Sequence, residues 1–283
     1  MTDERDAAPA DPLAAGAVMA RAGGENFPVA LAVLPRALRR HLLAIYGFAR
    51  LVDQIGDEAA GDRSAQLEEL EADVERVYAG EPHHQVLRPL VGTVREFAIP
   101  REPFLALIAA NRQDQVVSRY ETFEQLAGYC ALSANPVGQL VLYVLGAATP
   151  ERIALSDRIC TALQLAEHWQ DVAEDHARGR VYLPQEELKR FGVEDTDLSR
   201  CQTPQRVRDL IASEVERARG LLDEGRPLVR TLRGWGRLAV AGYVGGAYAA
   251  LDAIERAGYD VLAGPPTASR AGKLRATVRE LRG

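Results

Sequence analysis

Two short stretches of the chain place carboxylates, guanidiniums and a phenol at helical spacing. In the first, YGFARLVDQIGDE, Tyr46, Arg50, Asp53 and Asp57 occupy relative positions 0, 4, 7 and 11. At about 100° per residue, these four side chains lie in one narrow stripe of a helix. Carboxylates bind hard metal ions and guanidiniums bind anions, so this face is suited to a metal–anion complex.

The second stretch, QLAEHWQDVAEDHARGRVYLP, carries a similar stripe. It consists of Gln164, His168, Asp171, Asp175 and Arg178, with Glu167 and Glu174 beside it. On these residues alone two interpretations stay open. One is a solvated helix face with i,i+4 ion pairs, each worth roughly 0.3 kcal/mol. The other is a cation site.

Both stripes belong to helices that are apolar around much of the remaining circumference. Such helices are usually buried, so a polar stripe on them faces a cavity. Two acidic stripes across a cavity would repel each other unless cations lay between them. Facing Asp-x-x-x-Asp pairs therefore predict bound Mg²⁺, which keeps some of its waters and takes further oxygens from a diphosphate.

Helical periodicity dominates the whole sequence, and no convincing alternating strand run is present. Pro35 begins the first long helix, at a position where a proline costs no hydrogen bond. Further helices are predicted over 64–79, 85–97, 101–118, 122–147, 151–178, 204–231 and 235–257. The 283 residues are 47% hydrophobic and show no repeat or composition shift, which predicts an all-α fold with a single shared core.

The two ends differ from the middle of the chain. We expect a disordered leader over 1–20, a helical domain over 21–263 and a basic tail over 264–283. No secretory signal is visible, and the uncharged run 238–251 is shorter than the ~20 residues that span a bilayer. We expect a cytoplasmic protein, and weak contact of the basic tail with the inner membrane face stays an open alternative.

Net charge and cysteine usage argue against nucleic-acid binding, a disulfide framework and a zinc site. A net charge of −6 argues against nucleic-acid binding. The three cysteines are odd in number and widely spaced, which argues against both a disulfide framework and a zinc site.

The two acidic stretches, together with YCALSANPVG, resemble the motifs of the squalene/phytoene synthases, the head-to-head isoprenyl diphosphate synthases. The resemblance runs in the same order from about Glu25 to about Leu262. It implies an isoprenoid-synthase-type helical bundle around a central apolar cavity. Within the family, the chain is most similar to the hydroxysqualene synthases of bacterial hopanoid biosynthesis.

The resemblance implies roles for particular residues. The implied metal ligands are Asp53, Asp57, Glu167, Asp171, Glu174 and Asp175. The implied catalytic residues are Tyr46, Arg50, Asn135 and Arg178. The implied substrate-binding residues are Tyr46, Arg50, Tyr129, Gln164, Arg178 and Tyr248. His168 is expected to support the site rather than to act as a general base.

Three positions depart from the family pattern. Gln54 stands where a second aspartate of the first motif is usual, and Glu167 stands where an asparagine is usual. The first change removes a carboxylate that is often peripheral to the metals. The second replaces a neutral oxygen ligand with a charged one, which either tightens Mg²⁺ binding or marks a degenerate site. Gln139 replaces an arginine that is frequent in the sub-branch.

The implied reaction is Mg²⁺-dependent ionisation of presqualene diphosphate, with two or three ions, followed by a water quench to hydroxysqualene without NADPH. It also implies functional coupling to a presqualene diphosphate synthase. Two alternatives stay open. One is a sister enzyme that condenses two prenyl diphosphates such as farnesyl diphosphate to presqualene diphosphate, squalene or phytoene. The other is a non-catalytic assembly protein on the same fold.

The apolar, glycine-rich segment 236–254 allows two interpretations. Glycines in a helix cost about 1 kcal/mol each against alanine, so they need a reason. One reason is close packing against another helix, and the other is room for an apolar ligand. Segments 122–147 and 236–254 are the predicted cavity walls, and Asn135 at the expected helix break is the predicted holder of the quenching water.

Overall fold

The computed structural model describes residues 34–283, and every structural statement below concerns these residues. The predicted leader, 1–20, lies outside them. The described residues form helices connected by turns, with one isolated β-bridge between Arg119 and Val181. The all-α prediction is therefore confirmed. None of the described helices is long and apolar enough to cross a membrane.

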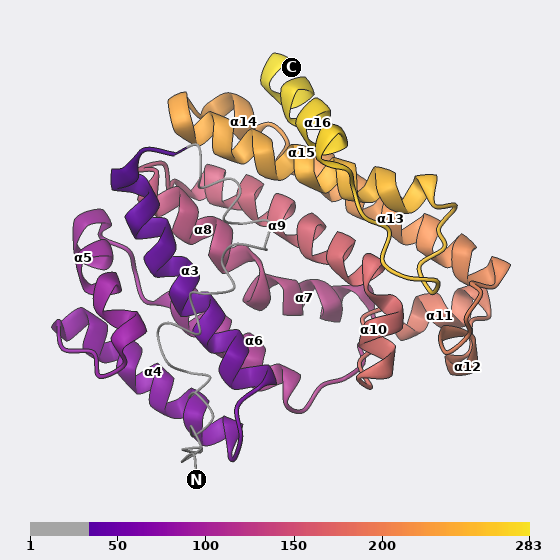
Figure 1. Ribbon diagram of the computed structural model, residues 1–283, viewed down its shortest axis with the longest axis horizontal. Helices are drawn as coiled ribbons and strands as arrows, with labels where there is room; N and C mark the ends of the chain where they lie inside the picture. Colours follow the sequence, from indigo (N-terminus) through magenta and orange to yellow (C-terminus); the bar gives the residue numbers. More distant parts are fainter. Residues whose placement is uncertain (1–33) are drawn as a thin grey trace, which may run out of the picture. The chain divides into compact units, whose positions relative to one another are not determined.

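The chain divides into two compact units, Met1–Arg112 and Gln113–Gly283. The described helices of the first unit are α3 (Arg36–Asp57), α4 (Arg63–Ala79), η2 (Gln85–Leu87), α5 (Arg88–Phe97) and α6 (Glu102–Asp114), the last of which ends just past the boundary (Figure 1). Helix α3 packs on α4, η2 and α5. Its buried Phe48 meets Phe104 of α6 edge to face, with ring centroids 5.0 Å apart.

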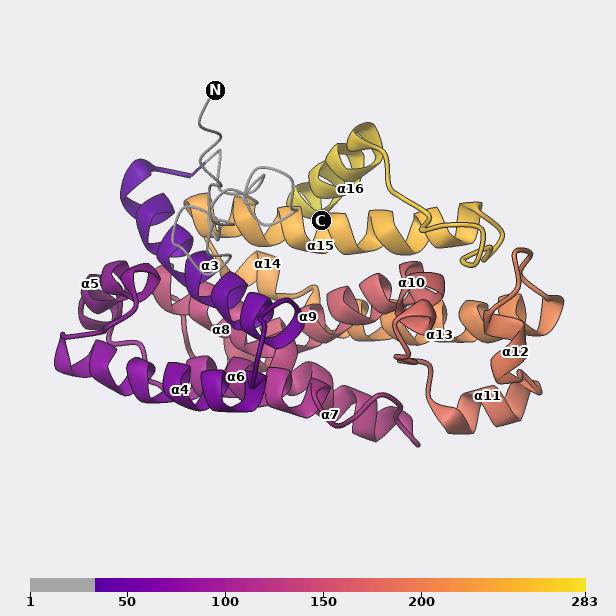
Figure 2. The ribbon, with the colours of Figure 1, turned by 60° about the horizontal axis from the view of Figure 1, so that its bottom comes forward.

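The second unit contains ten helices among its described residues. They are α7 (Phe123–Ser133), α8 (Asn135–Val144), α9 (Pro150–Gln170), α10 (Val172–Ala177), α11 (Gln185–Phe191), α12 (Asp195–Leu198), α13 (Gln205–Gly225), α14 (Leu228–Thr231), α15 (Gly234–Arg256) and α16 (Arg270–Arg282). Helix α9 is central and packs against α8, α13 and α15. Helix α15 lies between α13 and α16 (Figure 2).

Several predicted helices are divided in the structure. The segment 122–147 breaks at Ala134, directly before the Asn135-Pro136 pair, into α7 and α8. The segment 151–178 was predicted to be continuous, but Asp171, with φ −102° and ψ 16°, ends α9 and precedes α10. The segment 204–231 divides into α13 and α14, and α11 and α12 were not predicted.

The structure explains one glycine of α15 by close helix packing. A Cβ added to Gly245 would lie 2.5 Å from the backbone nitrogen of Thr277 and 2.7 Å from its Cα, so α16 requires a glycine there. By contrast, a Cβ on Gly242 or Gly246 would meet no atom within 4 Å. The region expected as a basic tail, 264–283, therefore includes a helix packed on α15.

Candidate active site

The first predicted stripe lies on α3, which contains all four of its members. Tyr46 is buried and Arg50 is half-buried, whereas Asp53 and Asp57 are exposed. The Arg50 guanidinium lies 3.5 Å from the Glu58 carboxylate. The stripe therefore runs from an apolar surrounding at Tyr46 to two solvent-accessible carboxylates at the C-terminal end of the helix, where a metal ion could reach them.

Helix α6 contributes a side chain to this face that the sequence did not indicate. The Nδ2 atom of Asn111 lies 3.5 Å from Oδ1 of Asp53 and donates to the backbone oxygen of Leu107 at 3.3 Å. The approach depends on Gly56, because a Cβ there would lie 2.0 Å from Oδ1 of Asn111. The only sequence signal for this contact was a glycine inside the last turn of the helix.

Gln54, the first departure from the family pattern, is a buried residue with 4% exposure. It therefore lies on the inner side of α3, whereas its neighbour Asp53 is exposed. A carboxylate buried at that position would carry a large desolvation cost. The glutamine accordingly leaves the two exposed carboxylates of the stripe in place.

The second predicted stripe lies at the junction of α9 and α10. His168 is buried, Gln164, Asp171 and Asp175 are half-buried, and the remaining members, Glu167, Glu174 and Arg178, are exposed. Despite the break at Asp171, the junction brings His168 and Asp175 together, with Nδ1 3.9 Å from Oδ2. The guanidinium of Arg178 lies 3.8 Å from the Glu174 carboxylate.

The negative charges of the carboxylates at this junction are only partly balanced by nearby positive charges. Burial raises the pKa of Asp171 above its usual value, and the charges of Asp175 and Glu174 raise it further. Burial lowers the pKa of His168 even though Asp175 opposes that effect, so the imidazole is neutral near pH 7. A bound cation would relieve the repulsion among these carboxylates.

Behind the second stripe lies a stack of aromatic rings that the sequence did not predict. The ring of Tyr182 stacks on His168, with 3.7 Å between centroids and 14° between planes. Tyr182 also stacks with Tyr129 at 5.6 Å and with Tyr120 at 6.0 Å between ring centroids, and Tyr129 lies 6.2 Å from the ring of His168. Burial raises the pKa of Tyr182 to about 12, so its hydroxyl stays protonated at neutral pH.

The backbone around Gly179 places Tyr182 in this stack. Gly179 has φ +81°, a conformation that glycine adopts without strain, and it turns the chain away from α10. The following residues then pair with the segment before α7, since the nitrogen of Val181 donates to the oxygen of Ser118 at 2.8 Å. The available signal was the GRVYLP motif directly after the acidic stretch.

The hydroxyl of Tyr129, a predicted substrate-binding residue, donates to Oδ2 of Asp114 at 2.8 Å. Burial raises the pKa of Tyr129 most strongly, and Tyr182 and Asp114 raise it further. Tyr129 therefore remains a neutral phenol that is held by a carboxylate.

Asn135, the predicted holder of the quenching water, is a buried residue at the first position of α8. Its Oδ1 accepts a hydrogen bond of 3.0 Å from the Thr161 hydroxyl on α9. One turn further along α8, Gln139 donates to Oδ1 of Asp157 at 3.0 Å. Burial raises the pKa of Asp157 above its usual value. Polar pairs therefore line part of the contact between α8 and α9.

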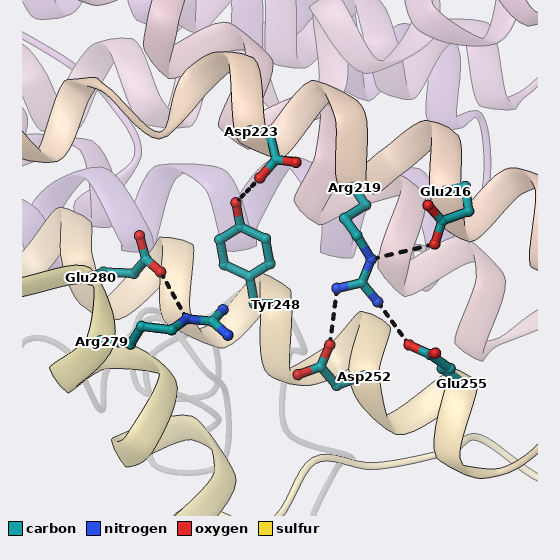
Figure 3. Close-up of polar contacts among 8 residues, drawn as sticks. All are labelled: Glu216, Arg219, Asp223, Tyr248, Asp252, Glu255, Arg279 and Glu280. Carbon is teal, nitrogen blue, oxygen red and sulfur yellow. Dashed lines mark hydrogen bonds and ion pairs between the residues drawn. The ribbon is translucent and has the colours of Figure 1, made fainter. Parts of the chain in front are cut away.

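Tyr248, the last predicted substrate-binding residue, lies where α13, α15 and α16 meet (Figure 3). Its hydroxyl donates to Asp223 of α13, and the guanidinium carbon of Arg279 lies 4.9 Å from the centroid of its ring. In the same view, Arg219 of α13 forms ion pairs with Asp252 and Glu255 of α15, each at 3.0 Å. Tyr248 thus belongs to a set of polar contacts that joins these three helices.

Within residues 34–283, no group of three or more histidine, cysteine, aspartate or glutamate side chains is arranged so that it could hold a metal ion by itself. Mg²⁺ does not need such a group, because it commonly uses one or two carboxylates together with waters and substrate phosphates. The hard oxygen donors on α3 and at the α9–α10 junction fit that mode of binding, and at the junction burial together with the charges of Asp175 and Glu174 raises the pKa of Asp171.

Comparison with known proteins identifies the family. A profile of the squalene/phytoene synthases matches residues 20–279. The chain belongs to the squalene/phytoene synthase family. It is 33% identical over 251 residues to a 15-cis-phytoene synthase of Synechocystis sp., covering 84% of this chain and 74% of the relative. It is 34% identical over 211 residues to a hydroxysqualene synthase of Rhodopseudomonas palustris, covering 74% and 72%.

A solved structure supports the same conclusion. The squalene synthase HpnC from Alicyclobacillus acidocaldarius is 44% identical to this chain, with a TM-score of 0.81 and coverage of 86% of this chain and 92% of that one. The family resemblance and the isoprenoid-synthase fold are thereby confirmed. The chain is an enzyme of the prenyltransferase type that acts on prenyl diphosphates, and its family uses a divalent metal ion.

Proposed function

We propose that this squalene/phytoene synthase is a hydroxysqualene synthase, which converts presqualene diphosphate and water to hydroxysqualene and diphosphate. The observation that carries the diphosphate chemistry is the cluster of Asp171, Glu174 and Asp175 at the α9–α10 junction, where burial and then the charges of Asp175 and Glu174 raise the pKa of Asp171. The similarity to a hydroxysqualene synthase supports the specific reaction.

The proposed metal ligands are the carboxylates of the two stripes, namely Asp53, Asp57, Asp171 and Asp175, with Glu167 and Glu174 beside the second pair. When bound, Mg²⁺ supplies Lewis acidity to the oxygens of the leaving diphosphate. We expect Arg50 and Arg178 each to bind diphosphate oxygens through charge-assisted hydrogen bonds, with Tyr46 as a further donor. Gln164, Tyr129 and Tyr248 are the proposed contacts to the rest of the substrate.

The water that quenches the rearranged cation needs a polar group in an otherwise apolar wall. Asn135 is our candidate, because it is buried and its oxygen is held by the Thr161 hydroxyl at 3.0 Å. With that oxygen engaged, the Nδ2 group of Asn135 remains to bind the water. We expect Asn135→Leu to lower the alcohol yield and divert the cation to elimination products, while a Thr161→Val variant should show a smaller change in the same direction.

Purified protein incubated separately with presqualene diphosphate and with farnesyl diphosphate, each with Mg²⁺ or with excess EDTA, tests the proposal. We expect presqualene diphosphate to give a C30 alcohol only with Mg²⁺, without NADPH, and with an oxygen that carries the label of ¹⁸O-water. Unlabelled alcohol would contradict the quench, and full turnover in EDTA would contradict the metal requirement.

A sister enzyme is the second candidate, and its support is the similarity to a 15-cis-phytoene synthase at nearly the same identity. Consumption of farnesyl diphosphate or of a longer prenyl diphosphate, with presqualene diphosphate or phytoene as the final product, would establish it instead. Absence of turnover with every prenyl diphosphate would favour an assembly role. Under the favoured proposal, coupling to a presqualene diphosphate synthase follows, because that enzyme must supply the substrate.

A further inference from the structure

His168 is held from two sides in a buried position beside the second acidic stripe. Its ring stacks on Tyr182 at 3.7 Å, and its Nε2 lies 3.2 Å from the amide nitrogen of Gln164. The side chain is 7% exposed. These contacts leave the imidazole little freedom to turn, so the direction of its second nitrogen is fixed by the fold.

The contact with Gln164 indicates which nitrogen of the imidazole carries the proton that faces Asp175. An amide nitrogen can only donate, so Nε2 of His168 must accept and the ring proton lies on Nδ1. Nδ1 is the nitrogen that faces Oδ2 of Asp175, at 3.9 Å. This separation is longer than a direct hydrogen bond, and the N–H dipole therefore acts on the carboxylate electrostatically.

One side of Asp175 borders a small unfilled space. The residue lines a small cavity of about 10 Å³, roughly the space of one water molecule, together with His168, His176, Arg180 and Tyr182. A carboxylate next to such a space can change its orientation unless a polar neighbour restrains it. His168 is the neighbour whose own orientation is restrained by stacking and by Gln164.

We propose that His168 is the positioning residue of Asp175, and that its Nδ1–H, held by Tyr182 and Gln164, keeps the carboxylate oriented for a divalent cation. The inference rests on the proposed function of Asp175 as a metal ligand. Groups that orient metal ligands in this way commonly change metal affinity by about 10- to 100-fold when they are removed. Under this proposal, Tyr182 restrains the ring of His168, and His168 in turn orients the carboxylate of Asp175.

Two substitutions separate positioning from packing. His168→Phe keeps a ring against Tyr182 but removes the Nδ1 donor, whereas His168→Asn loses the ring but keeps an amide nitrogen near the place of Nδ1. The readout is Mg²⁺-dependent binding of inorganic pyrophosphate by titration calorimetry, which requires no turnover. We expect His168→Phe to weaken this binding at least about 10-fold and His168→Asn to stay within about 3-fold of the unchanged protein. His176→Gln, which keeps a group near Nε2 beside Asp195, is the matched control and should bind normally.

The opposite order would overturn the inference. If His168→Phe binds normally while His168→Asn binds weakly, the histidine serves the ring stack alone. Thermal unfolding of each variant without ligand identifies any loss of binding that arises from misfolding. A His168→Phe variant that folds and binds pyrophosphate normally is enough to refute the positioning role of His168. Asp175→Asn separates the two hypotheses. Normal binding by that variant refutes the metal role of Asp175, whereas weak binding beside normal His168→Phe refutes only the role of His168.

Discussion

Glu214 provides the sharpest test of the energetics of the second unit. The residue lies in the middle of α13 with 0% exposure, and neither of its carboxylate oxygens has a hydrogen-bond partner among the described residues. The Nε atom of Arg217 is 3.4 Å away, but Arg217 also donates to Glu187 at 2.9 Å. Burial raises the pKa of Glu214 to about 7, with Glu187 raising it and Arg217 and Arg190 lowering it.

The sign of the resulting pH dependence follows from this raised pKa. A folded-state pKa of about 7 against an ordinary value of 4.5 means that folding favours the protonated Glu214. Its contribution to stability is fully present below pH 4.5 and is lost as the pH rises to about 7. At about 1.36 kcal/mol per pH unit, the loss amounts to about 3 kcal/mol.

The test is Glu214→Gln, because glutamine preserves the shape and removes the titration. We expect the variant to unfold with nearly the same free energy as the unchanged protein near pH 4.5 and to be more stable by about 3 kcal/mol at pH 8. Urea unfolding at several pH values between these limits measures the difference. Glu216→Gln, which changes an exposed glutamate of the same helix, is the control and should give no such trend. A stability difference that is independent of pH would refute the reasoning.

Three further predictions follow from other parts of the structure. Asp53→Asn and Asp171→Asn should abolish turnover, and Mg²⁺ with millimolar pyrophosphate should raise the melting temperature of the unchanged protein but of neither variant. Gly245→Ala should lower the free energy of unfolding by about 1–3 kcal/mol, because the added methyl group would clash with the backbone of α16. Gly242→Ala, where the methyl group meets no atom within 4 Å, should raise the free energy of unfolding by up to about 1 kcal/mol. Urea unfolding of both variants measures these changes. Leu274 is 66% exposed and lies beside Arg275, Arg279 and Arg282 on α16. Leu274→Glu should therefore reduce co-sedimentation of the protein with anionic liposomes at low salt. Equal sedimentation of the variant and the unchanged protein would contradict the membrane hypothesis.

The long helices could be predicted because their signals are local. Helix α4 was expected over 64–79 and spans Arg63–Ala79, where Asp62 accepts from the nitrogen of Ala65 and Gly80 closes the end with φ +96°. Caps and three- to four-residue periodicity are read from a short window of sequence. The break before α8 was visible for the same reason, since Asn135-Pro136 marks it.

The missed elements depend on contacts with distant residues. Helix α12 is only four residues long, and its buried Asp197 is held by the Arg206 guanidinium across the following loop at 2.6 Å. Such a short helix has no hydrophobic period to detect and is marginal without its tertiary partners. The division at Asp171 likewise follows no proline or glycine, so the sequence offered no local reason to end α9 there.

The candidate site divides along the same line between local and distant information. Each stripe of carboxylates lies on one helix or one helix junction, so spacing alone placed Asp53 with Asp57 and Asp171 with Asp175. The groups that contact or orient these carboxylates come from distant parts of the chain or follow a turn. The spacing of residues in the sequence does not reveal either. Asn111 reaches Asp53 from α6, and Tyr182 stacks on His168 after the turn at Gly179, where φ is +81°.

This division explains why His168 was difficult to interpret from sequence. Its position in the stripe placed it near Asp175 and it was expected to support the site rather than to act as a general base, but spacing could not show which group it supports. The structure adds the two restraints that matter, a stacked ring on one face and an amide donor at Nε2. Because those restraints orient Nδ1–H toward the carboxylate, the residue acts on Asp175 rather than on the substrate, and a donor at that place should serve equally well on a different side chain.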